Sequence, residues 1–132
     1  MKNILITGAA GFIGYHAVLK LAAKGYAVTG IDNLNDYYDP RLKIARLKDS
    51  GIETGLFPDS EPVRSKLLPG YTFIKLDLKD RQKTAELFTG NQFDIVINLA
   101  AQPGARHSFV DPYVYIDSNI EAFINVLEGC RQ

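Results

Sequence analysis

The 132-residue sequence has one cysteine, no net charge and no long apolar run. With Cys130 alone, an internal disulfide is impossible, and we expect this residue to be a small buried side chain rather than a reactive thiol. The 15 Lys and Arg residues balance 15 Asp and Glu residues, so no overall field attracts nucleic acid or an anionic membrane. The apolar runs are too short for a signal peptide or a membrane span, which favours a cytoplasmic protein.

Short apolar runs alternate with segments of helical periodicity along the chain. Asp80 is expected as an N-cap, Pro40 in a first helical turn, and Gly25 just after a helix. Residues 49–70 are rich in glycine and proline and are expected to form an irregular insertion. The expected strands are 3–7, 26–31, 71–76 and 94–100, and the expected helices are 12–24, 40–48, 80–89 and 112 to the end.

This alternation predicts an α/β fold, a Rossmann-type doubly wound parallel sheet that is incomplete, with about four strands and flanking helices. Residues 1–132 are read as one domain, the amino-terminal portion of a dinucleotide-binding domain. The last helix has apolar residues on more than one side, which is typical of a helix buried on two faces. We therefore expect a homodimer through this helix and an exposed sheet edge beside strand 94–100. The apolar residues are Ile116, Ile120, Phe123 and Leu127 in one stripe, with Ile124 and Val126 outside it.

The strongest functional signal is the turn Gly8-Ala9-Ala10-Gly11-Phe12-Ile13-Gly14, between the first expected strand and helix. In this context, three glycines are typical of a turn that binds a dinucleotide pyrophosphate. Gly8 permits the tight turn, Gly11 lets the backbone approach the pyrophosphate, and Gly14 lets helix and strand pack closely. The N–H groups at the start of the helix favour an anion. The alternative is a glycine-rich turn without a ligand.

Asp32 lies directly after the second expected strand, 18 residues after Gly14. A carboxylate at this place can accept hydrogen bonds from the hydroxyls of an adenosine ribose. Its charge would repel the 2′-phosphate of NADP, and no Arg or Lys lies between Asp32 and Arg41 to offset it. The sequence therefore predicts NAD as the cofactor; the alternative is a solvated aspartate in a turn.

Further candidate residues follow the third and fourth expected strands. Asp77 is placed to accept a hydrogen bond from an adenine amino group, and the small residues of 98–102 would let a flat cofactor approach the backbone. Arg106 suits a phosphate or carboxylate, or alternatively pairs with one of the aspartates that follow it. His16 and His107 lack partners for a metal site or a catalytic triad, so we expect no metal.

Together these segments resemble the extended short-chain dehydrogenase/reductase superfamily and its NAD-dependent epimerase/dehydratase family. The runs 32–43 and 102–106 are most similar to UDP-glucuronate 4-epimerases and related enzymes of capsule-polysaccharide biosynthesis. The resemblance covers nearly the whole chain and is interrupted at 49–70. It rests on the glycine-rich turn, the run 32–43, Asp77-Leu78, the run 98–102, and the pattern Pro112-x-x-Tyr115-x-x-x-Asn119.

The resemblance implies a tightly held NAD that takes a hydride from C4 of a UDP-sugar and returns it to the opposite face. For Arg106 it suggests contact with the sugar or carboxylate of the substrate. The cofactor-binding positions it implies are Gly8, Gly11, Phe12, Ile13 and Gly14 at the pyrophosphate, Asp32 and Asn33 at the ribose, Asp77 and Leu78 at the adenine, Leu99, Ala100 and Ala101 at the nicotinamide, and Asn119 for the strand-edge geometry, with Asp36 as a further position.

The family also uses a catalytic Ser/Thr and a Tyr-x-x-x-Lys pair. We expect these beyond the last helix, after Gln132, and expect no tyrosine of this chain to form the pair. On this interpretation the chain is a fragment that binds NAD. None of its residues is expected to be catalytic, and the chain does not epimerise a sugar by itself.

Two other functions stay open. A dehydratase or reductase of the same superfamily would differ only in the absent part. A non-catalytic NAD-sensing or interaction module would use the fold without the chemistry, since a fold alone does not define a function.

Overall fold

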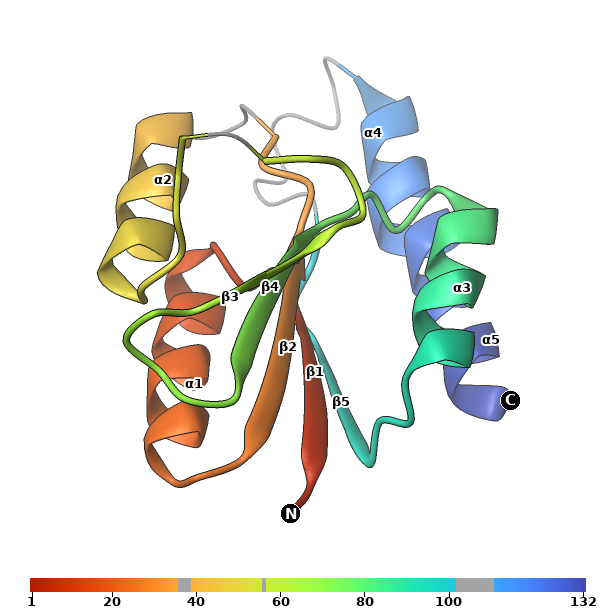
Figure 1. Cartoon of the computed structure of the whole chain (residues 1–132). Helices are drawn as coiled ribbons and strands as arrows, with labels where there is room; N and C mark the ends of the chain where they lie inside the picture. The colour runs from red at the N-terminus through yellow and green to blue at the C-terminus, as the bar shows by residue number, and fades with distance from the viewer. Residues whose placement is uncertain (36–38, 56, 102–110) are drawn as a thin grey trace.

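The computed structural model describes residues 1–35, 39–55, 57–101 and 111–132, which form a five-stranded sheet between two layers of helices (Figure 1). The predicted Rossmann-type α/β fold is confirmed. The strands are β1 (Asn3–Thr7), β2 (Ala27–Asp32), β3 (Pro62–Arg64), β4 (Tyr71–Lys75) and β5 (Ile95–Asn98). The helices are α1 (Phe12–Ala23), α2 (Pro40–Asp49) and α3 (Arg81–Gly90), then α4 (Pro112–Ile116), the π-helical segment η2 (Asp117–Glu121) and α5 (Ala122–Arg131).

The strand order is β3-β4-β2-β1-β5, and the four strands from β4 to β5 are parallel. From β1 the chain moves outward through β2 to β4, then returns to place β5 on the other side of β1. The direction of winding therefore reverses between β1 and β5. In open α/β sheets, a ligand crevice forms at the carboxyl ends of the strands at such a point.

Helices cover both faces of the sheet: α1 and α2 lie on one side, and α3 and α5 lie on the other (Figure 1). Alternate residues of β1 divide between the two layers because side chains of a strand point to opposite faces. Ile4 and Ile6 pack with Val18 of α1, whereas Leu5 packs with Val126 of α5. This explains why β1 is a nearly continuous apolar run.

The residues expected to begin or end helices are found at the helix ends. The Asp80 carboxylate accepts a hydrogen bond from the N–H of Lys83 at 3.0 Å, which caps α3. Helix α2 begins at Pro40, and its N-cap is Asp39. Gly25 follows α1 with φ = +91°, in the left-handed region where glycine is least strained.

The segment 49–70 is more regular than expected. It contains β3, which pairs antiparallel with β4, so the sheet has five strands rather than about four. The three residues of β3 are too few to show the alternation of polar and apolar residues that indicates a strand. A proline is tolerated at the start of an edge strand because its missing N–H costs no hydrogen bond of the sheet. The connection is also fixed by Ser65, whose hydroxyl donates to the carbonyl of Ser50 at 2.6 Å.

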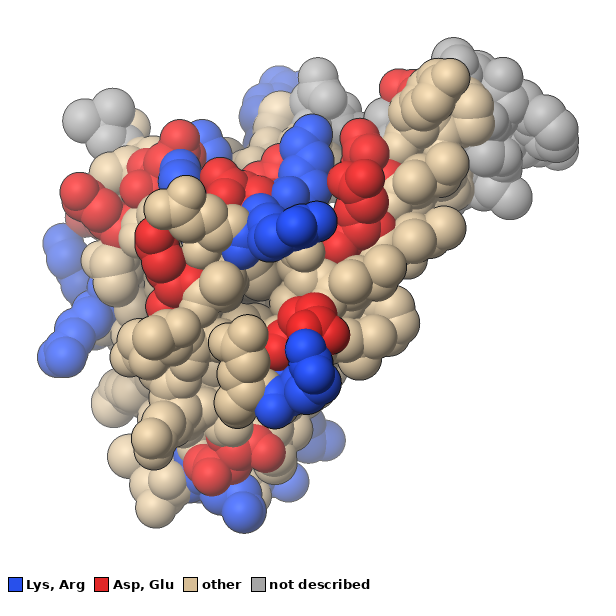
Figure 2. Space-filling view, turned by 90° about the vertical axis from the view of Figure 1, so that its right-hand side faces the viewer, with Lys and Arg blue, Asp and Glu red and all other residues tan. Residues whose placement is uncertain are grey.

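The last helix is covered on one side only within the described residues. Ala122 and Val126 of α5 are buried, but Phe123 and Leu127 are 44% and 50% exposed. In Figure 2, which looks onto the side of the molecule that carries α3 to α5, acidic and basic side chains are intermixed with areas of uncharged surface. The predicted apolar stripe is therefore accessible. Cys130 was expected to be buried, but it lies on the exposed side of α5.

Two other features concern the edge of the sheet and the last helix. Among the described residues, β5 pairs only with β1, so it leaves the expected unpaired edge. The π-helical turn η2 inside the last helix was not predicted. No helix in the described part of the chain combines the length and the apolar character that crossing a membrane requires.

Candidate functional site

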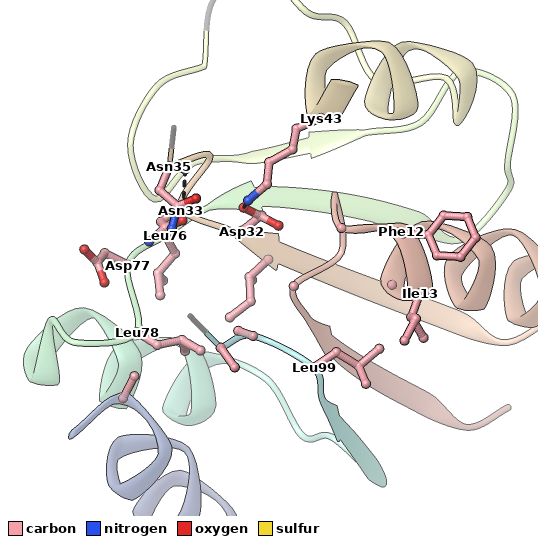
Figure 3. A pocket seen from close by; sticks show the side chains of 17 residues that line it. Phe12, Ile13, Asp32, Asn33, Asn35, Lys43, Leu76, Asp77, Leu78 and Leu99 are labelled. Carbon is pink, nitrogen blue, oxygen red and sulfur yellow. Dashed lines mark hydrogen bonds and ion pairs between the residues drawn. The ribbon is translucent and has the colours of Figure 1, made fainter. Parts of the chain in front are cut away.

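A pocket of about 410 Å³ opens at the carboxyl ends of the parallel strands, where the winding of the sheet reverses (Figure 3). Twelve of the fifteen residues proposed from the sequence line it: Gly8, Gly11, Phe12, Ile13, Gly14, Asp32, Asn33, Asp77, Leu78, Leu99, Ala100 and Ala101. Five lining residues were missed: Ile31, Asn35, Lys43, Leu76 and Ala122.

The glycine-rich turn forms the floor between β1 and α1. Gly8 has φ = +73°, and its carbonyl accepts the N–H of Gly11 at 3.0 Å. A Cβ on Gly14 would lie 2.1 Å from the Gly8 carbonyl oxygen, so only glycine lets α1 begin this close to the turn. No side chain caps the amino end of α1, and its first turn contains no acidic residue. This helix end therefore has N–H groups available to an anion in the pocket.

Asp32 connects the end of β2 with the glycine-rich turn. Its Oδ2 accepts the N–H of Ala10 at 3.1 Å, and its Oδ1 accepts the N–H of Leu34 at 2.8 Å. The same Oδ1 lies 3.0 Å from Nζ of Lys43, and Figure 3 shows the two side chains pointing toward each other. The expectation that no cation offsets Asp32 was therefore wrong. Lys43 lies two residues after Arg41, and α2 brings it back over the end of β2.

Helix α2 also holds the glycine-rich turn from outside the pocket. Nη1 of Arg46 donates to the carbonyl of Ala10 at 3.1 Å, so both polar groups of the Ala10 backbone have a partner. The hydroxyl of Tyr15 on α1 donates to the carboxylate of Asp49, and this hydrogen bond raises the pKa of Tyr15 above its ordinary value. Contacts of α2 with the turn and with α1 thus fix the segment that lines the pocket.

Thr7 fixes the opposite wall. Its buried hydroxyl donates to Oδ1 of Asn98 at 2.5 Å and accepts the N–H groups of Leu99 and Ala100 at 3.0 and 3.1 Å. The backbone after β5 is thereby held against Gly8, where a Cβ would come within 3.0 Å of the Ala100 nitrogen. Sequence reasoning treated Thr7 only as a strand residue and missed this role.

The third wall follows β4. The carboxylate of Asp77, which lines the pocket, accepts the N–H of Lys79 at 3.1 Å through Oδ1, and its Oδ2 lies 3.9 Å from the Lys79 ammonium group. The carbonyl of Leu78 accepts hydrogen bonds from Thr84 at 3.2 Å and from Asn125 at 2.7 Å. Side chains of α3 and α5 therefore set the position of Leu78 on the lining.

Three proposed residues are not seen at the pocket. Asn119 lies in η2 with an exposed side chain and is not among the lining residues. Asp36 and Arg106 lie outside the described residues. Across the part of the chain that is described, no group of three or more His, Cys, Asp and Glu side chains is placed to hold a metal ion.

One pair in this chain does have the Tyr-x-x-x-Lys spacing: Tyr71 and Lys75. Both lie on β4, where four residues span about 13 Å rather than the ~6 Å of a helix, so the two side chains do not meet. Burial, and next the nearby Asp32 carboxylate, raise the pKa of Tyr71 far above its ordinary value. A general base needs the opposite shift, so this pair is structural.

Comparison with known proteins matches residues 4–132 to the NAD dependent epimerase/dehydratase family, and the chain belongs to this family. Protein CapI of Staphylococcus aureus is 43% identical over 129 residues, which are 98% of this chain and 34% of that protein. UDP-glucuronate 4-epimerase 1 of Arabidopsis thaliana is 39% identical over 130 residues, 98% of this chain and 26% of the relative. The chain thus spans about a third or less of the curated relatives it matches.

A solved structure gives the same result for the fold. UDP-glucuronic acid 4-epimerase from Bacillus cereus, in complex with UDP-glucuronic acid and NAD, superposes with a TM-score of 0.77 at 30% identity. The match covers 98% of this chain and 36% of that enzyme.

The close approach at Gly14 makes a direct prediction. Gly14→Ala should lower the free energy of unfolding by about 3 kcal/mol or more, because the new Cβ meets backbone atoms that no rotamer change can move. Urea unfolding followed by circular dichroism measures this change. The matched control is Gly90→Ala at the end of α3, where nothing lies within 4 Å of the new Cβ and stability should rise by up to about 1 kcal/mol. Equal effects of the two substitutions would contradict the packing described for the turn.

Proposed function

We propose that this chain is the NAD-binding part of a nucleotide-sugar 4-epimerase, with UDP-glucuronate and UDP-galacturonate as the interconverted sugars. The observation that carries the proposal is a single pocket that joins an uncapped helix end at a glycine-rich turn to the Asp32 carboxylate at the end of the next strand. This pairing suits a molecule with a pyrophosphate next to a ribose.

The lining residues fit NAD in order along the pocket. The turn from Gly8 to Gly14 would hold the pyrophosphate, where a larger residue than Gly11 would approach the Gly8 carbonyl to 3.2 Å. Asp32 and Asn33 would hold the adenosine ribose, with the adenine against Leu78. The small residues at Ala100 and the next position would lie against the nicotinamide. When bound, NAD supplies a hydride acceptor at the sugar C4.

The choice of sugar rests on relatives. UDP-glucuronate 4-epimerases of Arabidopsis thaliana and the Bacillus cereus enzyme are among the similar proteins, and UDP-glucose 4-epimerases are similar in structure too. We place the proton-transferring residues in the part of such enzymes that this chain does not span. Arg106 is proposed to contact the sugar or its carboxylate, and the exposed stripe with Phe123 and Leu127 is proposed to bind a second copy.

The role of Asp32 is tested by Asp32→Asn, which keeps the shape of the side chain and removes its charge. We expect NAD to bind about 10- to 100-fold more weakly, because hydrogen bonds to a charged group are stronger than those to a neutral one. Isothermal titration of the 132-residue chain measures the dissociation constant. Asp59→Asn, at a largely exposed carboxylate outside the pocket, is the control and should leave binding unchanged. Unchanged affinity for NAD in both variants would show that Asp32 does not take part in binding.

The reaction is tested on the protein encoded by the complete gene. Incubation with UDP-glucuronate should yield UDP-galacturonate without net consumption of NAD, as resolved by chromatography. The 132-residue chain alone should yield none. Conversion of UDP-glucose but not of UDP-glucuronate would contradict the substrate, and a product that has lost water would indicate a dehydratase. No conversion of any nucleotide sugar would favour a non-catalytic NAD-binding module.

A further inference from the structure

Lys43 and Asp32 form an ion pair inside the pocket. Nζ of Lys43 lies 3.0 Å from Oδ1 of Asp32, and the two side chains are only 13% and 4% exposed. Both residues line the pocket, so the pair faces the space that a ligand would occupy (Figure 3). A carboxylate that would otherwise be a lone negative charge is thus neutralised within the site.

The hydrogen bonds of Asp32 show which partner is free to move. An ionised carboxylate has about four acceptor positions. Backbone N–H groups of Ala10 and Leu34 take one on each oxygen, and Lys43 takes the second position on Oδ1. A ribose presents two adjacent hydroxyls, so both can reach this carboxylate only if Lys43 shares its position or turns aside. Asp32 is held by the backbone, whereas Lys43 is on a flexible stem.

The other cations of α2 do not reach this place: Lys48 is exposed, and the two arginines have partners elsewhere. Arg41 pairs with Asp39 at 2.7 Å on the surface, and Arg46 donates to the Ala10 carbonyl behind the glycine-rich turn. Of the cations on this helix, Lys43 is therefore the one that would face the adenosine ribose, and with it the 2′-phosphate of NADP, if the cofactor binds as proposed.

We propose that Lys43 sets the selectivity between NAD and NADP. It cancels the charge with which Asp32 would repel a 2′-phosphate, and its ammonium group can donate to that phosphate when it turns from Asp32. The preference for NAD is then weaker than Asp32 alone would impose. This inference rests on the proposed binding of NAD in the pocket.

The test is the ratio of dissociation constants, NADP over NAD, measured by isothermal titration of the 132-residue chain. Lys43→Gln keeps a hydrogen-bond donor but removes the charge, and it should raise the ratio about tenfold or more, because a charge-assisted bond to the phosphate is lost. Lys43→Arg should leave the ratio within about threefold, since it keeps the charge. Lys48→Gln removes the same charge from an exposed position of α2 and should leave the ratio unchanged.

Each outcome decides a separate point. Binding of NAD with the same ratio in the parent chain and in Lys43→Gln would overturn the role of Lys43 and leave the proposed function standing. An equal rise in Lys48→Gln would also overturn it, because net charge alone would then explain the effect. A parent chain that binds neither nucleotide would overturn the proposed function, and the role of Lys43 with it.

A measurement on the unsubstituted chain covers the case in which Lys43→Gln does not fold. 2′-AMP presents the phosphate without the rest of the cofactor, and we expect it to bind at least as tightly as adenosine, with an affinity that falls as KCl is added. Binding more than about tenfold weaker than that of adenosine would show that Asp32 repels the phosphate despite Lys43, and would overturn the proposal.

Discussion

The carboxylate of Asp32 joins three segments that are far apart in the sequence: the end of β2, the glycine-rich turn and helix α2. It accepts the N–H groups of Ala10 and Leu34 and faces Lys43. Because this group is nearly buried, removing one partner of the ion pair would leave an uncompensated charge, which costs about 3–5 kcal/mol in proteins. The shape of the pocket therefore depends on the charge that is also proposed to bind the ribose.

The position of this carboxylate follows from the topology of the sheet. Parallel strands bring their carboxyl ends to one edge, and the reversal between β1 and β5 leaves that edge open. Thr7 and Asp32 lie at the ends of β1 and β2 and have equivalent roles. Each side chain accepts backbone N–H groups of a neighbouring segment and so fixes one wall of the pocket. Rigid walls with an uncapped helix end between them suit a long, charged, flat ligand.

Local signals in the sequence were enough to predict β1, α1 and the glycine-rich turn. The turn needs glycine at Gly8 and Gly14 for steric reasons that act within a few residues, so its pattern is readable. The short strand β3 was missed because its three residues depend on pairing with β4 and carry no periodicity of their own. Long-range contacts are the general reason for such misses.

The same distinction applies to the site. Asp32, Asp77 and Leu99 were predicted because each lies at or just after the end of a strand, and strand ends converge in this fold. Lys43 and Ala122 were not, because only the packing of α2 and α5 against the sheet brings them to the pocket. A helix has several faces, and the sequence does not distinguish Lys43 from the exposed Lys48 on the same helix.

The central claim is that NAD occupies this pocket, and a titration of the ¹⁵N-labelled chain with NAD, followed by amide chemical shifts, tests it most directly. The account predicts that the largest shifts fall on the amides from Gly11 to Gly14, with others at Asn33, Leu78 and Ala100. Amides of β3, on the far edge of the sheet, should not respond. Shifts centred away from the glycine-rich turn, or none at millimolar NAD, would contradict it.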